Sequence, residues 1–284
     1  MRTPSDPDRR RRVLVTGGAG TVARRLVLAT PAGVDLHLTA RRSQPPPEVA
    51  ARGTVHRIDL ARPGPVDRLL RDVAPDVGVH TAYTTGSRAD VVDATAAVAA
   101  AAAVTGAAMV HLSTDVVFAG DSPPYGEGDP LDPVSDYGRL KAEAERVAVT
   151  AVPDACITRT SLVVSTDPPD RATAGLAQAV RQGRTVTLFR DELRQPIRAD
   201  DLAAELWALL ALPRTERAGV WHLPGPEHLS RLELGLRLVD ALGLDRAPVR
   251  PGSVADHPTP RPRDTRLLAG RRRALGVALR PVDR

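Results

Sequence analysis

The sequence has few aromatic residues, one cysteine and no long apolar run, and each shortage excludes a class of protein. Aromatic residues make up 2% of the 284 residues. Without a basic stripe interleaved with aromatics, a nucleic-acid partner is not expected. Cys156 has no second cysteine to pair with, so an internal disulfide is excluded and a reducing, cytoplasmic location is expected. No apolar run approaches the ~18 residues that a membrane span needs, so no membrane partner is expected. We also expect no metal ligands.

The charge of the chain is modest and unevenly placed. The formal net charge is +5 at pH 7, and much of it lies in two arginine runs, residues 9–12 and 271–273. We expect residues 1–11 to form a disordered basic tail and not a secretory signal, because no apolar segment follows the basic residues. A small anionic ligand such as a dinucleotide suits this charge better than a polyanion does.

Up to about residue 160, short apolar strands alternate with helical segments. This alternation predicts an α/β fold, a doubly wound parallel sheet of the Rossmann type with right-handed crossovers. We assign residues 12–160 to a dinucleotide-binding domain and residues 161–284 mainly to a smaller C-terminal substrate-binding lobe, with some segments returning to the main sheet. The expected strands are residues 13–16, 34–40, 54–59, 77–81, 108–113 and 155–160.

Helices are expected between these strands and in the C-terminal part. Ser135 is expected to cap the helix that follows it, and Asp200 to cap a later one, because both residue types favour that position. Residues 194–197 are expected to form a loop. The other expected elements are helices at residues 21–28, 67–73, 89–105, 175–181, 200–212 and 230–242, and strands at residues 185–189 and 219–223.

A glycine-rich turn joins the first expected strand to the first expected helix. Residues 16–20 read TGGAG, and a strand, a glycine turn and a helix in this order are the context that a phosphate-binding loop requires. Glycines let the backbone approach a diphosphate, and the helix N-terminus offers amide N–H groups. We expect a cofactor here, although an ordinary strand–helix turn is the alternative. The expected contacts are Gly17, Gly20, Thr21 and Val22.

Two arginines follow the second expected strand. In dinucleotide-binding folds an acid at this position binds the ribose hydroxyls of NAD, whereas an arginine accommodates the 2′-phosphate of NADP. Because Arg41 and Arg42 stand here and no acid follows them, we expect NADP(H) as the cofactor in preference to NAD(H). The alternative is that both are surface residues of an arginine-rich chain.

Further cofactor contacts are expected where the third, fourth and fifth strands end, because ligands bind at the carboxyl ends of strands in open α/β sheets. Asp59 is expected beside the adenine, and Tyr83 is either a pocket wall or a packing residue. The residues expected to contact the cofactor at these ends are Asp59, Leu60, Thr81, Ala82, Tyr83 and Ser113.

Tyr137 and Lys141 stand four residues apart, which places both side chains on one face of a helix. Lys141 is the only lysine among 39 lysine and arginine residues. An ammonium is a compact point charge that fits between a phenol and a sugar hydroxyl, whereas a guanidinium is a broad planar fork. We expect this pair to have a function, and a surface cation beside a core tyrosine is the alternative.

Several segments that run in order along nearly the whole chain carry a family resemblance. They are residues 16–20 (TGGAG), 111–118 (HLSTDVVF), 137–141 (YGRLK), 159–161 (RTS), 194–197 (RQPI), 200–202 (DDL) and 261–267 (RPRDTRL). Together they resemble the extended short-chain dehydrogenases/reductases, and within them the dTDP-4-dehydrorhamnose reductase-like group of sugar-nucleotide reductases. The resemblance implies that Thr114, Tyr137 and Lys141 are catalytic, that the last two also bind NADPH, and that Arg194 and Arg261 bind a sugar nucleotide.

Three departures from the pattern of this group lie on the sugar side of the expected site. Val116 stands where the group usually has tyrosine, and Leu162 stands where an aromatic residue is usual. Residues 85–88 (TGSR) replace an acidic stretch. The resemblance therefore implies reductase chemistry and leaves the substrate open.

We expect an NADP(H)-dependent reductase of a keto group on a small molecule, a sugar nucleotide or a related polyol. Tyr137 would donate a proton, and Lys141 would lower the pKa of that phenol. Thr114, or less readily Ser113, would hydrogen-bond the substrate oxygen. Two alternatives stay open: an epimerase or dehydratase that keeps NAD bound, and a non-catalytic, nucleotide-binding regulatory subunit. A homodimer is compatible with the sequence.

Overall fold

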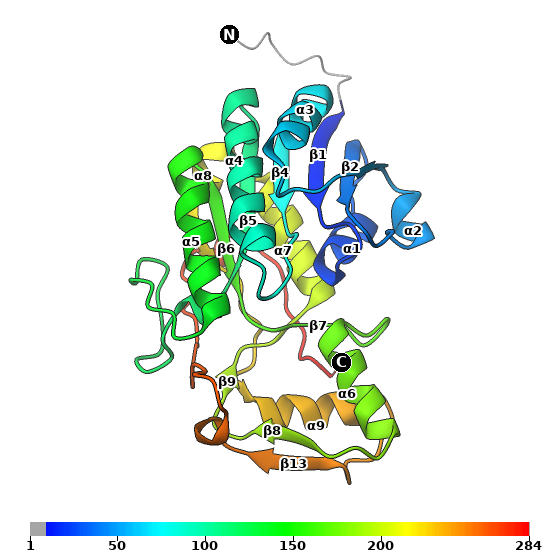
Figure 1. Cartoon of the computed structure of the whole chain (residues 1–284), viewed down its shortest axis with the longest axis vertical. Coiled ribbons are helices and arrows are strands. Elements are labelled where there is room, and N and C mark those ends of the chain that lie inside the picture. Colours follow the sequence, from blue (N-terminus) through cyan, green and yellow to red (C-terminus); the bar gives the residue numbers. More distant parts are fainter. Residues whose placement is uncertain (1–9, 284) are drawn as a thin grey trace.

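A parallel sheet lies at the centre of the computed structural model, which describes residues 10–283 (Figure 1). We expected a disordered tail at residues 1–11. Residues 1–9 of that segment lie outside the described residues. The sheet has seven strands in the order β3-β2-β1-β4-β5-β6-β11, and all neighbours run parallel, which confirms the predicted fold class. The strands are β1 (Arg11–Thr16), β2 (Val34–Ala40), β3 (Thr54–Arg57), β4 (Val77–His80), β5 (Ala108–Thr114), β6 (Cys156–Thr160) and β11 (Gly219–His222).

The strand order reverses beside β1. From β1 the chain adds β2 and β3 on one side, and then crosses over to add β4 on the other side. In open α/β sheets a ligand binds outside the carboxyl ends of the strands at such a reversal. The glycine turn follows β1 and the loop that begins at Thr81 follows β4, so these two segments meet at the reversal.

Helices cover both faces of the sheet. On one face α3 packs on α4 and α4 packs on α5, and on the other face α1 packs on α7. Consecutive residues of β1 serve the two faces: Val13 and Val15 lie in the core with α1 and α7, and Leu14 lies in the core with α3 and α4. Because both faces are covered, the strand is a continuous apolar run. The helices are α1 (Thr21–Leu28), α2 (Pro47–Ala50), α3 (Pro63–Val73), α4 (Ala94–Thr105), α5 (Asp136–Ala151) and α7 (Ala199–Ala211).

The helix expected at residues 89–105 has two parts. Residues Ala89–Asp93 form a π-helical turn, and α4 continues from there and ends at Gly106, whose φ of 72° is the left-handed conformation that glycine adopts readily. The π-helical turn carries Asp90, whose carboxylate reaches Arg41 at the end of β2. Turns of this kind are frequent at functional sites.

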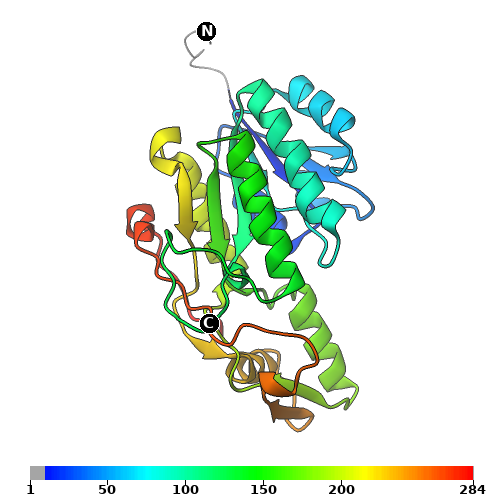
Figure 2. The same ribbon diagram turned by 60° about the vertical axis from the view of Figure 1, so that its left-hand side comes forward.

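A smaller lobe lies beyond the carboxyl ends of the sheet strands (Figures 1 and 2). In it, α6 and α9 lie beside the parallel pair β8 and β13, and the short pairs β7–β10 and β9–β12 lie between this lobe and the sheet. The chain also returns to the sheet, because β11 pairs with β6 and residues Arg271–Leu275 form a 3-10 turn beside β11. The elements are α6 (Arg171–Arg181), α8 (Arg214–Arg217), α9 (Arg231–Ala241), β7 (Val163–Val164), β8 (Val186–Phe189), β9 (Leu193–Arg194), β10 (Ile197–Arg198), β12 (Leu229–Ser230) and β13 (Val249–Gly252).

Two local expectations in the C-terminal part are wrong. Asp200 does not cap α7, because the helix begins at Ala199 and the Asp200 carboxylate lies in the first turn, 3.3 Å from Arg25 Nε. Residues 194–197 are not a plain loop, because they contain the end of β9 and the start of β10. In both cases partners from distant segments decide the local structure.

No helix within residues 10–283 is long and apolar enough to cross a membrane. Across the same range, no group of three or more His, Cys, Asp or Glu residues is arranged to hold a metal ion.

Candidate active site

The glycine turn is pressed against the loop that follows β4. Gly17 has a φ of 74°, and a Cβ there would lie 3.0 Å from the Cα of Ala82, so both conformation and space require glycine. Within the turn, Gly20 N–H donates to the Gly17 carbonyl at 2.8 Å, and Gly18 N–H donates to the Thr39 carbonyl at 2.8 Å. The turn is therefore bonded to β2 and packed against the loop after β4, at the point where the strand order reverses.

Thr16, the last residue of β1, is hydrogen-bonded to the loop that follows β4, called the β4 loop below. Its Oγ1 accepts hydrogen bonds from the backbone N–H groups of Thr81 and Ala82, each at 3.1 Å. The Thr81 hydroxyl donates to the Thr16 carbonyl at 2.7 Å. These bonds bring the predicted cofactor residues of the β4 loop against the predicted cofactor residues of the glycine turn.

The residues around the glycine turn fit a dinucleotide diphosphate. No side chain within the described residues caps the N-terminus of α1, because the residue before the helix is Gly20. The first amide N–H groups of a helix lack partners inside the helix, and the helix dipole favours an anion at this end. Thr21 and Val22 are the first two residues of α1, so their backbone groups are the ones that would face a diphosphate.

Arg41 is paired with acidic residues that the sequence places far from it. Its guanidinium forms a two-pronged ion pair with Asp90, with 2.8 Å between Nη2 and Oδ2, and lies 3.6 Å from Asp59 Oδ1. The hydrogen bond from Arg41 lowers the pKa of Asp90. No acid follows β2 in the sequence, but folding brings two carboxylates to this point. The arginine expected to bind a 2′-phosphate is therefore partly neutralised.

The other residues predicted near the adenosine half lie at the same edge of the sheet. Arg42 is exposed, and its carbonyl accepts a 3.3 Å hydrogen bond from Arg57 Nη1. Leu60 is buried in the core with α3 and α4. Asp59, between β3 and α3, accepts a hydrogen bond from the backbone N–H of Ala61. Arg42 and Asp59 are thus open to a ligand, and the Leu60 side chain is mainly a packing residue.

Helix α5 carries Tyr137 and Lys141 at a fixed distance from the end of β5. Ser135 caps the helix as predicted, with its Oγ accepting from the backbone N–H of Gly138 at 3.1 Å. A Cβ at Gly138 would overlap the carbonyl oxygen of Val116, so the helix approaches the loop after β5 as closely as backbones can. This close approach positions Tyr137 in its first turn.

Lys141 lies one helical turn after Tyr137 on α5 and is buried, with 4% of the residue exposed. Its Nζ donates to the Leu112 carbonyl at 2.7 Å and lies 3.2 Å from His111 Nε2. An ammonium can only donate, so Nε2 of His111 is the unprotonated nitrogen. Burial lowers the pKa of Lys141 to about 8, against the opposing charge of Glu145. Burial, Lys141 and His80 hold the pKa of His111 well below its usual value.

Tyr83 covers the Tyr137–Lys141 pair. The ring centroids of Tyr83 and Tyr137 are 5.7 Å apart, and Lys141 Nζ lies 5.9 Å from the Tyr83 centroid. Tyr83 is 52% exposed, so it forms the solvent-facing wall of this cluster. The structure thereby brings together one predicted cofactor residue and two predicted catalytic residues.

The pKa of Tyr137 differs from the expectation. Burial, the neighbouring Tyr83 phenol and the charge of Asp115 raise it well above the ordinary value. We expected Lys141 to lower this pKa, but its ammonium is turned to the Leu112 carbonyl and His111. Tyr137 is therefore protonated at neutral pH, as a proton donor must be.

Thr114 and Ser113 end β5 and point to different partners. Thr114 Oγ1 donates to Asp115 Oδ1 at 3.2 Å and accepts from the backbone N–H of Val116. The Ser113 hydroxyl is buried and donates to Glu145, which also binds Arg159 at 2.9 Å. Adjacent strand residues face opposite sides. Thr114 thus remains at the edge of the sheet, whereas Ser113 belongs to a buried ion pair.

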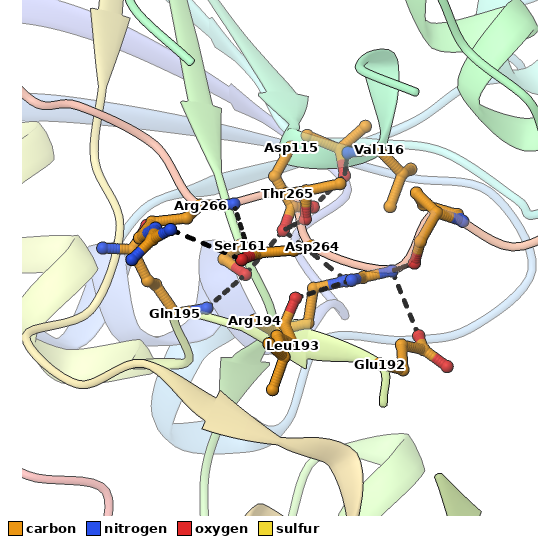
Figure 3. Close-up of polar contacts among 12 residues, drawn as sticks. Asp115, Val116, Ser161, Glu192, Leu193, Arg194, Gln195, Asp264, Thr265 and Arg266 are labelled. Atoms are coloured by element: carbon orange, nitrogen blue, oxygen red, sulfur yellow. Dashed lines mark hydrogen bonds and ion pairs between the residues drawn. The ribbon is translucent and has the colours of Figure 1, made fainter. Parts of the chain in front are cut away.

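Asp115 joins the sheet to the C-terminal part (Figure 3). Its Oδ2 accepts hydrogen bonds from the hydroxyls of Ser161 and Thr265, each at 2.7 Å, and lies 3.8 Å from Arg194 Nε. Asp115 is 2% exposed and contacts Thr114 through its other oxygen. We assigned no role to Asp115 from the sequence, where its only signal is an acid directly after a strand-end hydroxyl.

The two arginines predicted to bind the substrate are paired within the protein. Arg194 is 2% exposed, and its guanidinium donates to Glu192 at 3.1 Å and to the Pro262 carbonyl at 2.9 Å (Figure 3). Arg261 makes two hydrogen bonds to the same Glu192 carboxylate, at 2.9 and 2.8 Å. The Arg194 guanidinium therefore joins β9 to the segment around Pro262, and substrate binding by Arg194 and Arg261 stays a prediction.

The burial of Lys141 predicts a pH-dependent stability. Its pKa is about 8 in the folded chain and 10.5 unperturbed. Between these values the unfolded chain holds the proton and the folded chain has lost it, so stability rises with pH in that window. The gain is about 3 kcal/mol at ~1.4 kcal/mol per pKa unit. Unfolding by denaturant at each end of the window should show this rise relative to Lys141→Met, and parallel pH profiles of the two proteins would contradict it.

Comparison with known proteins gives the family of the chain. The profile described as RmlD substrate binding domain matches residues 11–281. A probable dTDP-4,6-dihydroxy-2-methyloxan-3-one 4-ketoreductase of Streptomyces antibioticus is 30% identical over 283 residues, covering 95% of this chain and 90% of that protein. A dTDP-4-dehydrorhamnose reductase of Sinorhizobium fredii is 31% identical, with 94% and 93% covered.

A solved structure shows the same fold. The dTDP-4-dehydrorhamnose reductase of Bacillus anthracis, in complex with NADP, superposes with a TM-score of 0.79 at 20% identity, covering 96% of this chain and 95% of that one. The resemblance drawn from the motifs is confirmed by these matches over nearly the whole chain. The chain belongs to the RmlD substrate binding domain family.

Proposed function

We propose that the protein is an NADP(H)-dependent reductase that converts a keto group of a sugar nucleotide to a hydroxyl. The observation that carries the proposal is the protonated Tyr137 phenol, whose ring lies 5.7 Å from the ring of Tyr83, with the Lys141 ammonium 5.9 Å from the same Tyr83 ring. This cluster lies at the carboxyl end of the sheet, where the glycine turn meets the β4 loop. The names of the relatives support the reaction class, because both are reductases of dTDP-linked keto sugars.

The cofactor would lie across the reversal of the strand order. The glycine turn and the first residues of α1 would bind its diphosphate, and Arg41 and Arg42 would face its adenosine end. NADPH, when bound, supplies the hydride for the carbonyl carbon. Tyr83 and Lys141 would then contact the nicotinamide half. The NADP in the Bacillus anthracis reductase supports this choice of cofactor.

Two side chains would act where negative charge develops on the oxygen of the substrate's keto group. Tyr137 donates its proton as negative charge develops on that oxygen, a role that requires a phenol protonated at working pH. Thr114 has one hydroxyl proton, which Asp115 accepts in the structure; turned to the substrate oxygen, that proton would stabilise the developing charge. Lys141, whose Nζ lies 5.9 Å from the Tyr83 ring, would contact the cofactor ribose and not the Tyr137 phenol.

Asp90 is expected to weaken the preference for NADPH. It holds the Arg41 guanidinium, which a 2′-phosphate would have to share. In Asp90→Asn the guanidinium loses its two-pronged partner and keeps only Asp59, at 3.6 Å, so we expect the ratio of NADPH to NADH affinity to rise about 2- to 5-fold, the range of an exposed ion pair. Titration with both cofactors, followed by nucleotide fluorescence, measures the ratio. A ratio that falls or stays constant would show that Arg41 does not face the 2′-phosphate.

The proposal is tested by cofactor binding and by turnover. The purified protein should bind NADPH, seen as a melting shift, and should consume NADPH in the presence of a keto-sugar nucleotide. Binding without turnover across a panel of such sugars would favour the regulatory subunit. Recovery of tightly bound NAD from the purified protein would favour the epimerase or dehydratase. The homodimer stays a prediction.

A further inference from the structure

Two stacked histidines are buried in the sheet next to Lys141. His80 of β4 and His111 of β5 are partners in the parallel register, and each is 1% exposed. Their ring centroids are 5.5 Å apart, with 27° between the ring planes. A buried polar ring costs free energy unless its nitrogens are hydrogen-bonded. The partners of the two rings therefore show what each histidine does.

His80 is hydrogen-bonded at both nitrogens. Thr16 Oγ1 already accepts from two backbone N–H groups, so its own proton goes to His80 Nδ1, at 2.9 Å. Burial lowers the pKa of His80 to about 3, so the ring is neutral and its proton is on Nε2, which donates to Thr95 Oγ1 at 3.2 Å. The Thr95 hydroxyl donates to the Val91 carbonyl at 2.6 Å. His80 is thus a fixed ring against which His111 stacks.

His111 is bonded at one nitrogen only. Its Nε2 accepts from the Lys141 ammonium at 3.2 Å, so the proton of its neutral ring is on Nδ1. Within residues 10–283, Nδ1 has no hydrogen-bond partner. A buried donor without an acceptor lowers stability, and an aliphatic side chain would fill this place without that cost. The geometry therefore points to a role for His111 through Nε2.

The Lys141 ammonium has three N–H groups, and the protein binds two of them. One donates to the Leu112 carbonyl at 2.7 Å and one to His111 Nε2. Glu145, one turn further along α5, is occupied by the Ser113 hydroxyl and by Arg159. Among the described residues no third acceptor is bonded to Nζ, so one N–H is left for a ligand.

The acidic groups on the elements around Lys141 are paired with other residues. Helix α5 packs against α4, which has no titratable residue, and against β5, the π-helical turn and the 3-10 turn at Asp115. Burial lowers the pKa of Lys141 to about 8, and Glu145 opposes the shift. The other titratable groups are the phenols of Tyr83 and Tyr137, the ring of His80, Asp90 bound by Arg41, Asp93 near Arg88, Asp115 bound by Ser161 and Thr265, and Glu143 bound by Arg88.

We propose that His111 is a positioning residue, whose neutral ring holds one N–H of the Lys141 ammonium and leaves one N–H for the ribose of a bound nicotinamide cofactor. The inference rests on the proposed function, because the ribose belongs to the same cofactor. His111 is buried and acts through Lys141 alone. A hydrogen bond to the charged form of a group favours that form. Without the His111 acceptor, Lys141 should therefore lose its proton at a lower pH.

The single lysine of the chain allows a direct test in the cofactor-free protein. Protein labelled with carbon-13 at the lysine ε-carbon gives one lysine signal, whose chemical shift against pH reports the pKa of Lys141. The wild-type midpoint should lie at about 8. In His111→Leu it should lie about one unit lower, because a hydrogen bond to a charged group is lost. His111→Gln should keep the wild-type midpoint, because a glutamine carbonyl can accept the same N–H.

His222→Leu is the matched control. It also removes a buried histidine whose Nε2 lies beside a cation, but that cation is Arg159, at 3.4 Å. We expect the Lys141 midpoint of this variant to equal that of the wild type. A second measurement needs no substitution: nitrogen chemical shifts of the wild-type His111 ring should show its proton on Nδ1.

Cofactor affinity should follow the same titration. With midpoints of about 8 and about 7, the affinity deficit of His111→Leu relative to the wild type should grow about 4-fold between pH 6.5 and pH 8. NADPH and NADH should show the same growth, because both contain this ribose. Fluorescence titration of each cofactor at the two pH values measures it.

An unchanged Lys141 midpoint in His111→Leu would overturn the proposal, even if that variant melts at a lower temperature, because His111 would then be only structural. An equal shift in His222→Leu, a wild-type proton on His111 Nε2, or an affinity deficit that does not grow with pH would overturn it too. If the wild type binds NADPH and the midpoints coincide, the inference fails and the reductase stands. If the midpoint shifts but neither cofactor binds the wild type, the pairing of His111 with Lys141 stands and the proposed function fails.

Discussion

Tyr137→Phe is expected to lower kcat by about 10²- to 10⁴-fold, the usual contribution of a positioned general acid. The phenyl ring keeps the tilted ring contact with Tyr83, at 5.7 Å between centroids, so the shape of the site and the binding of NADPH should be retained. The substitution removes only the phenolic hydroxyl, and with it the proton that would be donated. Steady-state kinetics with a keto-sugar nucleotide, combined with fluorescence titration of NADPH, separate the two effects.

Tyr83→Phe is the matched control for this substitution. Both phenols lie in one cluster, and the Tyr83 phenol helps to raise the pKa of Tyr137, so either could in principle be the donor. We expect Tyr83→Phe to retain most of the turnover, because the Tyr137 proton is still present. If Tyr83→Phe abolishes turnover and Tyr137→Phe does not, the assignment of the proton donor is wrong.

Asp115→Ala is expected to lower the free energy of unfolding by about 3–5 kcal/mol, the usual cost of removing one partner from a buried charged network. The substitution leaves the hydroxyls of Ser161 and Thr265 without their acceptor and removes a negative charge from beside Arg194. These groups come from three separate segments, so the junction between sheet and lobe should loosen. Denaturant unfolding of the two proteins measures the difference.

Asp115→Asn is the control that separates shape from charge. The amide keeps the volume and one acceptor oxygen, so we expect a smaller loss of stability than in Asp115→Ala. Both variants should also lose turnover, because Asp115 accepts the Thr114 hydroxyl and so orients it. If Asp115→Ala unfolds at the same denaturant concentration as the wild type, the network does not hold the lobe to the sheet.

Elements with strong local signals could be predicted from the sequence to the residue. Helix α1 spans Thr21–Leu28 and β2 spans Val34–Ala40, as expected, because glycine turns and apolar patterns bound them. Ser135 caps α5 for the same local reason. The start of α7 was missed, because Asp200 pairs with Arg25 of α1 and not with its own helix. The contact joins residues far apart in sequence, so no local rule contains it.

In the candidate site too, some features could be predicted from the sequence and others depend on distant contacts. Tyr137 and Lys141 are one helical turn apart, so their common face could be read from spacing alone. The pairing of Arg41 with Asp90 could not, because it depends on a π-helical turn meeting the end of β2.

The pairing of the arginines in the C-terminal part could not be predicted from the sequence. Arg194 and Arg261 share Glu192, whereas Arg231 has no partner within the described residues. The sequence gives the charge of each arginine, but only the fold shows which of them has no acidic partner among the described residues.

The most direct test of the proposed reaction follows one hydrogen from cofactor to product. NADPH carrying deuterium at C4 of the nicotinamide, on the face that is transferred, is incubated with the protein and a panel of keto-sugar nucleotides, and the products are analysed by mass spectrometry. The account predicts a product with one carbon-bound deuterium for the wild type, and a strongly reduced yield of it for Tyr137→Phe. A protein that binds NADPH but leaves every keto sugar unlabelled would contradict it.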